Sequence, residues 1–128
     1  MQVRGEGESG FLTNSNLNQK KVYLTFDDGP SDHTAQILDI LKKHKVKATF
    51  FVIGKSAVSY PDIVKRESNE GHLVGNHTYN HVEITKIGDK KAREEIEKTN
   101  TVLKEMLGKE IEYVRPPFGA WKKNWSRR

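Results

Sequence analysis

The 128-residue chain contains no cysteine. A disulfide framework and thiolate metal ligation are therefore excluded, and a metal site in this protein has to use histidine, aspartate or glutamate. The sequence also has no run of about 18 apolar residues, which argues against a transmembrane segment. The first residues, MQVRGEGESGFLTNSN, are polar and lack the apolar stretch of a signal peptide. The length favours one domain, because domains typically have roughly 100 to 200 residues.

The excess of positive charge is confined to one end of the chain. The sequence carries 22 basic and 17 acidic side chains, which give a formal net charge of +5 at pH 7. Residues 1–114 hold 17 of each sign, so the excess comes entirely from Arg115, Lys122, Lys123, Arg127 and Arg128. A nucleic-acid-binding face would need a basic stripe across the body of the domain, and we therefore predict no nucleic-acid partner.

Short apolar runs alternate with amphipathic segments. Residues 1–19 are rich in Gly, Asn and Ser and are interpreted as a flexible leader, and residues 20–128 as the folded domain. Four strands are predicted at 22–26, 48–53, 73–74 and 111–114. Three helices are predicted between them: one capped by Asp32 with Ile40 on its apolar face, one from Pro61 to near Gly71, and one over 89–107. This order indicates an α/β fold with parallel strands.

Polar residues follow each predicted strand. Chemistry in parallel sheets gathers at the carboxyl ends of the strands, so these residues are expected to share one rim. They are Asp27 and Asp28 after the first strand, Gly54 and Lys55 after the second, Asn76 and His77 after the third, and Arg115 after the fourth.

Two acids at the end of a buried strand are costly, because neighbouring carboxylates resist joint ionisation and a bound cation would relieve that cost. Asp28 also begins an Asp-Gly-Pro sequence, which is equally typical of a simple turn. His77 and His81 are four residues apart, so on one helical turn they would lie on the same face. Such a pair alone is often a surface feature, but Asp28, His77 and His81 together would make an open metal site, with Asp27 beside it as a base.

Arg115 precedes Pro116 and Pro117 and is placed to pair with Asp27, although an ordinary surface arginine before a stiff turn is an equal alternative. The other histidines, which are interpreted as structural, are His33, His44 and His72.

Four segments together carry a specific resemblance. They are TFDDGP at 25–30, ATFFVIG at 48–54, GNHTYNH at 75–81 and RPPFG at 115–119. In this order they resemble the first three signature motifs of the polysaccharide deacetylase family, also called the NodB-homology domain or carbohydrate esterase family four. The resemblance implies a distorted (β/α) barrel, of which this chain would form about the first half as a C-terminally truncated member.

The resemblance also implies functions for individual residues. Asp27 corresponds to the catalytic base, Arg115 to the residue that orients it, and Asp28, His77 and His81 to the ligands of a divalent metal, usually zinc and sometimes cobalt. The backbone at Pro117 and Phe118 corresponds to part of the oxyanion-stabilising site. The implied reaction is hydrolysis of N-acetyl or O-acetyl groups on a polysaccharide such as peptidoglycan or chitin, at the cell envelope or outside the cell.

Two further readings of the sequence remain open. The family's late Asp-Trp and Leu-Leu-His-Asp motifs are not found in this sequence, and losing a general acid typically costs roughly 10² to 10⁴ in rate. An inactive fragment or a non-catalytic metal- or carbohydrate-binding remnant is therefore an alternative. A phosphoacceptor receiver domain has a similar length and acidic pair, but it needs an Asp where Asn76 and His77 stand. Trp121 and Trp125, among basic residues, are interpreted as the start of a next barrel helix or as a basic membrane-binding tail.

Overall fold

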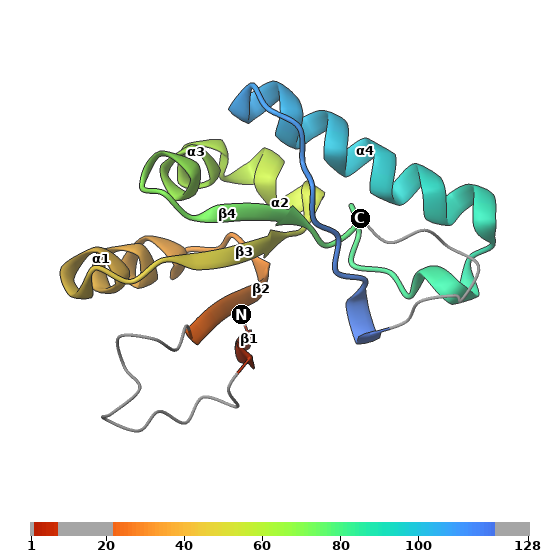
Figure 1. Cartoon of the computed structure of the whole chain (residues 1–128). Helices are drawn as coiled ribbons and strands as arrows, with labels where there is room; N and C mark the ends of the chain where they lie inside the picture. The colour runs from red at the N-terminus through yellow and green to blue at the C-terminus, as the bar shows by residue number, and fades with distance from the viewer. Residues whose placement is uncertain (1, 8–21, 120–128) are drawn as a thin grey trace.

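One four-stranded sheet organises the protein. The computed structural model describes residues 2–7 and 22–119. The strands are β1 (Gln2–Gly7), β2 (Val22–Gly29), β3 (Ala48–Val52) and β4 (Leu73–Asn76), and they lie in the order β1-β2-β3-β4. Figure 1 shows this order from β1 at the bottom to β4 above. The pairs β2–β3 and β3–β4 are parallel, which confirms the predicted α/β fold with parallel strands.

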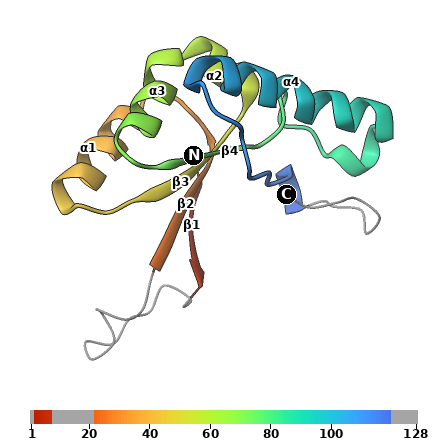
Figure 2. The same cartoon turned by 45° about the horizontal axis from the view of Figure 1, so that its top comes forward.

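The helices follow the parallel strands along the chain. They are α1 (Thr34–His44), α2 (Gly54–Ser59), α3 (Pro61–Asn69) and α4 (Asp89–Leu107), with short 3₁₀ turns η2 (Ile84–Lys86) and η3 (Pro117–Gly119). In Figure 2 the four helices form an arc along one side of the strands, with β1 at the far end from α4. None of the helices in the described part of the chain is long and apolar enough to cross a membrane.

Local sequence explains where the helices begin and end. Pro61 occupies the first turn of α3, where its missing N–H costs nothing. Gly108 ends α4 in the left-handed conformation, with its N–H bonded to the carbonyl of Lys104. The prediction missed α2, because the six residues of that helix offer only two buried positions, Gly54 and Ala57.

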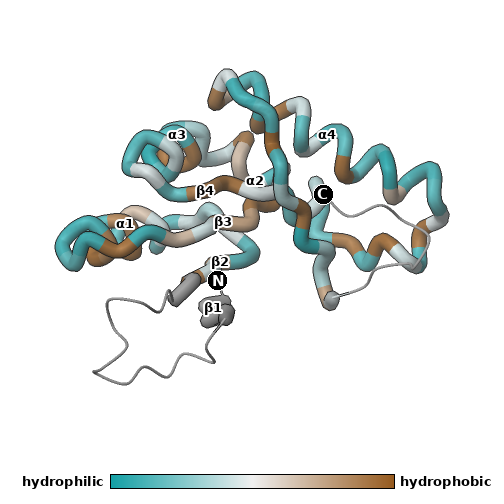
Figure 3. Tube along the Cα trace, viewed as in Figure 1, coloured by the Kyte–Doolittle hydropathy of each residue, from teal (hydrophilic) through white to brown (hydrophobic). Residues whose placement is uncertain are grey.

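The core lies between the sheet and the helices. Phe26 of β2 stacks on Phe50 of β3 with ring centroids 5.1 Å apart. Leu38 of α1, Val64 of α3 and Leu103 of α4 are fully buried against these strands. Figure 3 shows hydrophobic residues along β3 and β4, whereas much of the outer surface of α4 is hydrophilic. The helical faces thus meet the apolar strands, as their spacing predicted.

Two strand predictions need correction. Residues 2–7, expected within the flexible leader 1–19, form β1, which pairs antiparallel with β2. An edge strand needs backbone hydrogen bonds more than apolar side chains, so hydropathy gave no signal. Segment 111–114, expected as a strand, contributes only an isolated bridge between Val114 and Asn76. Ile111 packs instead against the core cluster.

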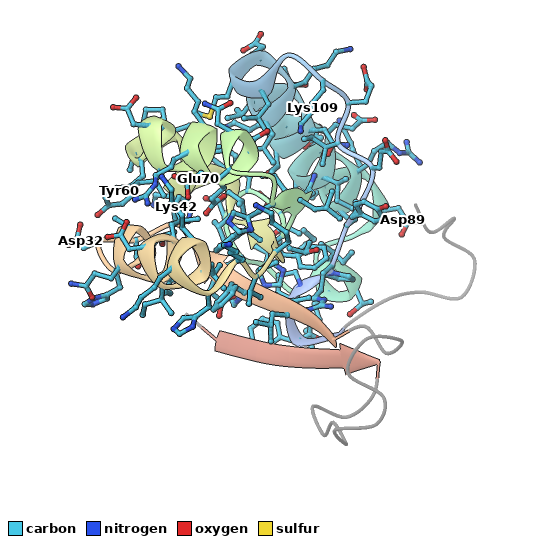
Figure 4. All side chains as sticks on the ribbon, turned by 60° about the vertical axis from the view of Figure 1, so that its left-hand side comes forward. Asp32, Lys42, Tyr60, Glu70, Asp89 and Lys109 are labelled. Carbon is cyan, nitrogen blue, oxygen red and sulfur yellow. The ribbon has the colours of Figure 1, made fainter. Side chains whose placement is uncertain are left out.

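Two predictions about α1 are also wrong. Asp32 does not cap the helix, because the N-cap residue is His33 and makes no side-chain cap. Asp32 accepts a 2.7 Å hydrogen bond from the hydroxyl of Tyr60, and Figure 4 shows the two side chains together. This hydrogen bond to a carboxylate raises the pKa of Tyr60. Ile40 is 58% exposed, because buried Thr34, Leu38 and Leu41 define a narrower apolar face.

Trp121 and Trp125, interpreted from the sequence as the start of a next barrel helix or as a basic tail, lie outside the described residues.

Candidate metal centre

The end of β2 presents two carboxylates in different directions. The register between β2 and β3 shifts between Asp27 and Gly29, so Asp28 is the extra residue of a bulge. Asp28 has a φ of 73°, an unusual conformation for a residue with a Cβ. A bulge re-aims a side chain relative to the regular strand, and here the re-aimed residue is Asp28, next to Asp27. Asp27 is 1% exposed, whereas the Asp28 side chain is 30% exposed.

His77 follows β4 and is buried. Its Nδ1 lies 2.6 Å from the backbone carbonyl oxygen of Arg115. Because a carbonyl can only accept, Nδ1 donates the proton and the neutral ring keeps a lone pair on Nε2. Burial lowers the pKa of His77, against the opposing effects of the Arg115 carbonyl and of Asp27 and Asp28. A neutral ring with Nε2 unprotonated is the form that binds a metal.

His81 reaches the same point by a loop. Residues 77–83 contain no helix, which corrects the prediction that His77 and His81 share a helical turn. Thr78 and His81 adopt positive φ values of 67° and 56°, and these residues fold the chain back on itself. The two imidazole rings lie with centroids 5.1 Å apart.

The three predicted metal ligands converge. Nε2 of His77 lies 2.9 Å, and Nε2 of His81 3.0 Å, from Oδ1 of Asp28. One ligand atom from each of these residues lies within 4.8 Å of the others. With His77 neutral, its Nε2 and the Asp28 oxygen turn lone pairs toward each other, a repulsion that a cation relieves. Two imidazoles and a carboxylate also match the donor set of open zinc sites, so these residues fit a divalent metal.

Arg115 joins the second carboxylate to the site. Its Nη1 donates to Oδ1 of Asp27 at 3.2 Å and to the hydroxyl of Thr25 at 3.0 Å. The guanidinium also lies 4.3 Å from the centre of the Phe51 ring. An arginine fixed on these groups holds the Asp27 carboxylate in one orientation. The pairing of Arg115 with Asp27 that the sequence predicted is present in the structure.

The turn after Arg115 closes one side of the centre. Phe118 has a φ of 63° and is 69% exposed. Its ring packs edge-on against His81, with centroids 5.2 Å apart. Pro117 is buried. The structure thus brings the predicted Phe118 to the metal-ligand group.

The histidines interpreted as structural lie elsewhere in the fold. His33 and His44 stand at the two ends of α1. His72 is buried, and its Nδ1 accepts a 3.0 Å hydrogen bond from the backbone N–H of Ala48. Burial lowers the pKa of His72, and the nearby charge of Lys47 adds to this effect.

Sequence reasoning missed several supporting residues. Thr25 stands two residues before Asp27, and strand alternation could have placed it on the same face. Asn76 is fully buried; its amide donates to the Ile96 carbonyl and to Asn100, both at 2.8 Å, and its oxygen accepts from the Thr78 N–H at 2.8 Å. The contacts with Ile96 and Asn100 connect α4 to the end of β4, and no local sequence pattern predicts them.

Comparisons with known proteins identify the family of this chain. A family model described as polysaccharide deacetylase matches residues 14–127. The peptidoglycan-N-acetylglucosamine deacetylase of Bacillus cereus is 48% identical over 103 residues, covering 80% of this chain and 38% of that protein. The chitooligosaccharide deacetylase of Rhizobium leguminosarum bv. trifolii is 42% identical over 106 residues, covering 81% of this chain and 49% of the relative.

A solved structure supports the fold as well. The peptidoglycan deacetylase PdaC from Bacillus subtilis matches with a TM-score of 0.76 at 42% identity, covering 77% of this chain and 50% of that one. This likeness confirms the expected deacetylase-type (β/α) barrel as the fold to which the sheet and helices belong. The chain spans half or less of the length of each of these three relatives.

Proposed function

The chain belongs to the polysaccharide deacetylase family, and from this premise we propose that its site hydrolyses the N-acetyl groups of an acetylated glycan. One observation carries the proposal: a candidate metal-ligand group of Asp28, His77 and His81 stands beside the buried carboxylate of Asp27, which is paired with Arg115. Hydrolysis of an amide needs both an electrophilic centre and a base, and the site offers candidates for each.

Asp28, His77 and His81 would hold the metal. A divalent ion bound there supplies Lewis acidity, which polarises a carbonyl and makes a bound water more acidic. We favour zinc, with cobalt as the second choice, because two imidazoles and one carboxylate are borderline ligands of the kind zinc accepts. The Arg115 carbonyl would contribute by holding His77 in the tautomer that leaves the lone pair of Nε2 available to a metal.

Asp27 would act as the base. Its carboxylate takes a proton from the attacking water, whose oxygen forms a bond to the acetyl carbon. The same proton is then available to the amine nitrogen as the C–N bond breaks, so a free amine and acetic acid result, and the acid loses its proton to the solvent to give acetate. Arg115 and Thr25 fix the carboxylate for this transfer, because Nη1 of Arg115 bridges the two side chains. The backbone N–H of Phe118, in the turn with Pro117, would donate to the oxyanion that forms on the acetyl oxygen.

Peptidoglycan is the substrate that we propose first. The relatives from Bacillus cereus and Bacillus subtilis are named as peptidoglycan deacetylases, whereas the Rhizobium protein is named for chitooligosaccharides. Both glycans contain the acetamido group that the proposed chemistry needs.

Acetate release tests the proposal. The purified chain, loaded with zinc, is incubated with peptidoglycan and with N-acetylglucosamine oligomers, and acetate is measured enzymatically. We expect release from at least one glycan, and a loss of about 10² to 10⁴ in rate in Asp27→Asn, as for removal of a general base. Asp27→Asn should still bind zinc. Zinc binding by the parent chain without acetate release from either glycan would refute the proposed reaction and favour the non-catalytic alternative.

A further inference from the structure

The segment that carries His81 has an irregular backbone. We call residues 78–81, between β4 and η2, the His81 loop. Thr78 and His81 both have positive φ values, which cost free energy for residues with a Cβ. Such a backbone persists only where its surroundings fix it. The position of His81 therefore depends on the groups that hold this loop.

One side of the His81 loop is bound to the start of α2. The backbone N–H of Gly54 donates to the Thr78 carbonyl at 2.9 Å, and the N–H of Lys55 donates to the Tyr79 carbonyl at 3.0 Å. The fit is close, because a Cβ on Gly54 would lie 2.5 Å from Cδ1 of Tyr79. These contacts use the carbonyl groups of Thr78 and Tyr79, and the Thr78 N–H donates to Asn76. The N–H groups of Tyr79 and Asn80 are left for another partner.

Glu95 of α4 is that partner. Its Oε1 accepts hydrogen bonds from the backbone N–H groups of Tyr79 at 3.0 Å and Asn80 at 2.8 Å. Its Oε2 accepts from the side-chain amide of Asn80, also at 2.8 Å. One carboxylate thus receives three N–H donors from two consecutive residues, and hydrogen bonds to an ionised acceptor are about twice as strong as neutral ones.

A second contact from the same helix supports this arrangement. The ammonium of Lys98, three residues after Glu95, lies 4.0 Å from the centre of the Tyr79 ring. The loop therefore lies between α2 and α4, and Glu95 supplies the negative charge on the α4 side.

We propose that Glu95 is a positioning residue that fixes the His81 loop so that His81 meets Asp28 and His77. His77 is fixed independently, because its N–H donates to the Val52 carbonyl and its ring donates to Arg115. Within the described part of the chain, the His81 side chain contacts Asp28 and the rings of His77 and Phe118, all of which belong to the site itself. The inference rests on the metal site of the proposed function and adds the group that makes its third ligand available.

Two matched variants separate this proposal from general destabilisation. Glu95→Ala removes all three hydrogen bonds, and Glu95→Gln keeps an acceptor for the backbone N–H groups but loses the charge. Glu97→Ala is the control, since Glu97 is exposed on the same helix. Zinc affinity is measured by calorimetry. We expect Glu95→Ala to weaken it about 10- to 100-fold, as for other residues that orient metal ligands. The zinc affinity of Glu95→Gln should fall between those of the parent chain and Glu95→Ala, and Glu97→Ala should bind zinc like the parent chain.

Two further measurements decide whether Glu95 acts through His81. In a His81→Ala background, adding Glu95→Ala should cause no further loss of zinc affinity. Amide hydrogen exchange without metal should be faster at Tyr79 and Asn80 in Glu95→Ala, and unchanged at Phe50 in β3. Equal zinc affinities for Glu95→Ala and Glu97→Ala, additive losses in the double variant, or faster exchange throughout would each overturn the proposal. A parent chain that binds no zinc would refute the proposed metal site. Hydrogen exchange at Tyr79 and Asn80 would still test whether Glu95 restrains the His81 loop.

Discussion

Replacing Glu67 with glutamine is expected to make the chain increasingly more stable than the parent as the pH rises above the range where glutamate ionises. Glu67 lies on the inner face of α3, three residues after buried Val64, and is fully buried. Neither carboxylate oxygen has a hydrogen-bond partner among the described residues. Burial raises the pKa of Glu67 well above its usual value of 4.5.

The sign and size of the effect follow from linkage. Below the unfolded-state pKa, both states hold the proton and the pH has no effect through this group. Above it, the unfolded chain ionises Glu67 while the folded chain stays protonated, so unfolding releases a proton and a rising pH favours unfolding. The free energy of unfolding therefore falls by about 1.4 kcal/mol per pH unit until the pH reaches the folded-state pKa. The total free energy of unfolding of a domain is only about 5 to 15 kcal/mol. A rise of two pH units in this range would therefore remove a large fraction of the stability.

Urea denaturation followed by circular dichroism measures this effect. The parent chain and Glu67→Gln are unfolded at several pH values from about 4.5 to about 7, a window that starts at the ordinary pKa of glutamate. Taking the difference between the variants removes the contributions of other titrating groups, His77 among them. A difference that grows with pH at about the stated slope supports the account. Parallel pH profiles would show that Glu67 does not stay protonated on folding and would refute it.

Three other substitutions probe the core and the site. Leu38→Ala should destabilise the chain by about 2 to 5 kcal/mol, measured as a lower urea midpoint, because a fully buried side chain leaves a cavity; a loss under about 1 kcal/mol would contradict this. Gly75→Ala should cost about 1 to 3 kcal/mol and lower the melting temperature, because the new Cβ would lie 2.7 Å from the Phe51 ring; an unchanged melting temperature would refute the close packing. Arg115→Lys should lower kcat for acetate release with little change in zinc affinity, because one ammonium replaces a guanidinium that bridges Asp27 and a hydroxyl; an unchanged kcat would contradict its positioning role.

Much of the fold follows from local patterns. Strands β2 and β3 contain short runs rich in branched and aromatic residues, and α4 keeps its apolar spacing up to Gly108, so their positions could be predicted. Strand β1 could not, because its sequence has no strong apolar pattern and it is held by backbone pairing with β2. The segment 111–114 has a composition that suggests a strand, but it pairs with β4 at one point, the bridge between Val114 and Asn76.

The site shows the same division between local and tertiary information. The identities of Asp28, His77 and His81 stand out in the sequence, since parallel strands bring their ends to one rim. The backbone conformation that brings His81 to the site does not stand out in the sequence. The spacing of four residues between His77 and His81 suggests a helical turn, but the chain forms a loop with positive φ values. Glu95 meets that loop from α4, 14 residues after His81. Such contacts depend on helix packing, which hydropathy patterns do not specify.

Zinc binding tests the central claim most directly. The metal-free chain is titrated with zinc by calorimetry at neutral pH, beside Asp28→Asn and His81→Gln. The account predicts one zinc per parent chain and a large loss of affinity in both variants, because each removes one of three converging donors. A parent chain that binds no zinc, or variants that bind it as tightly as the parent, would contradict the claim that Asp28, His77 and His81 form a metal centre.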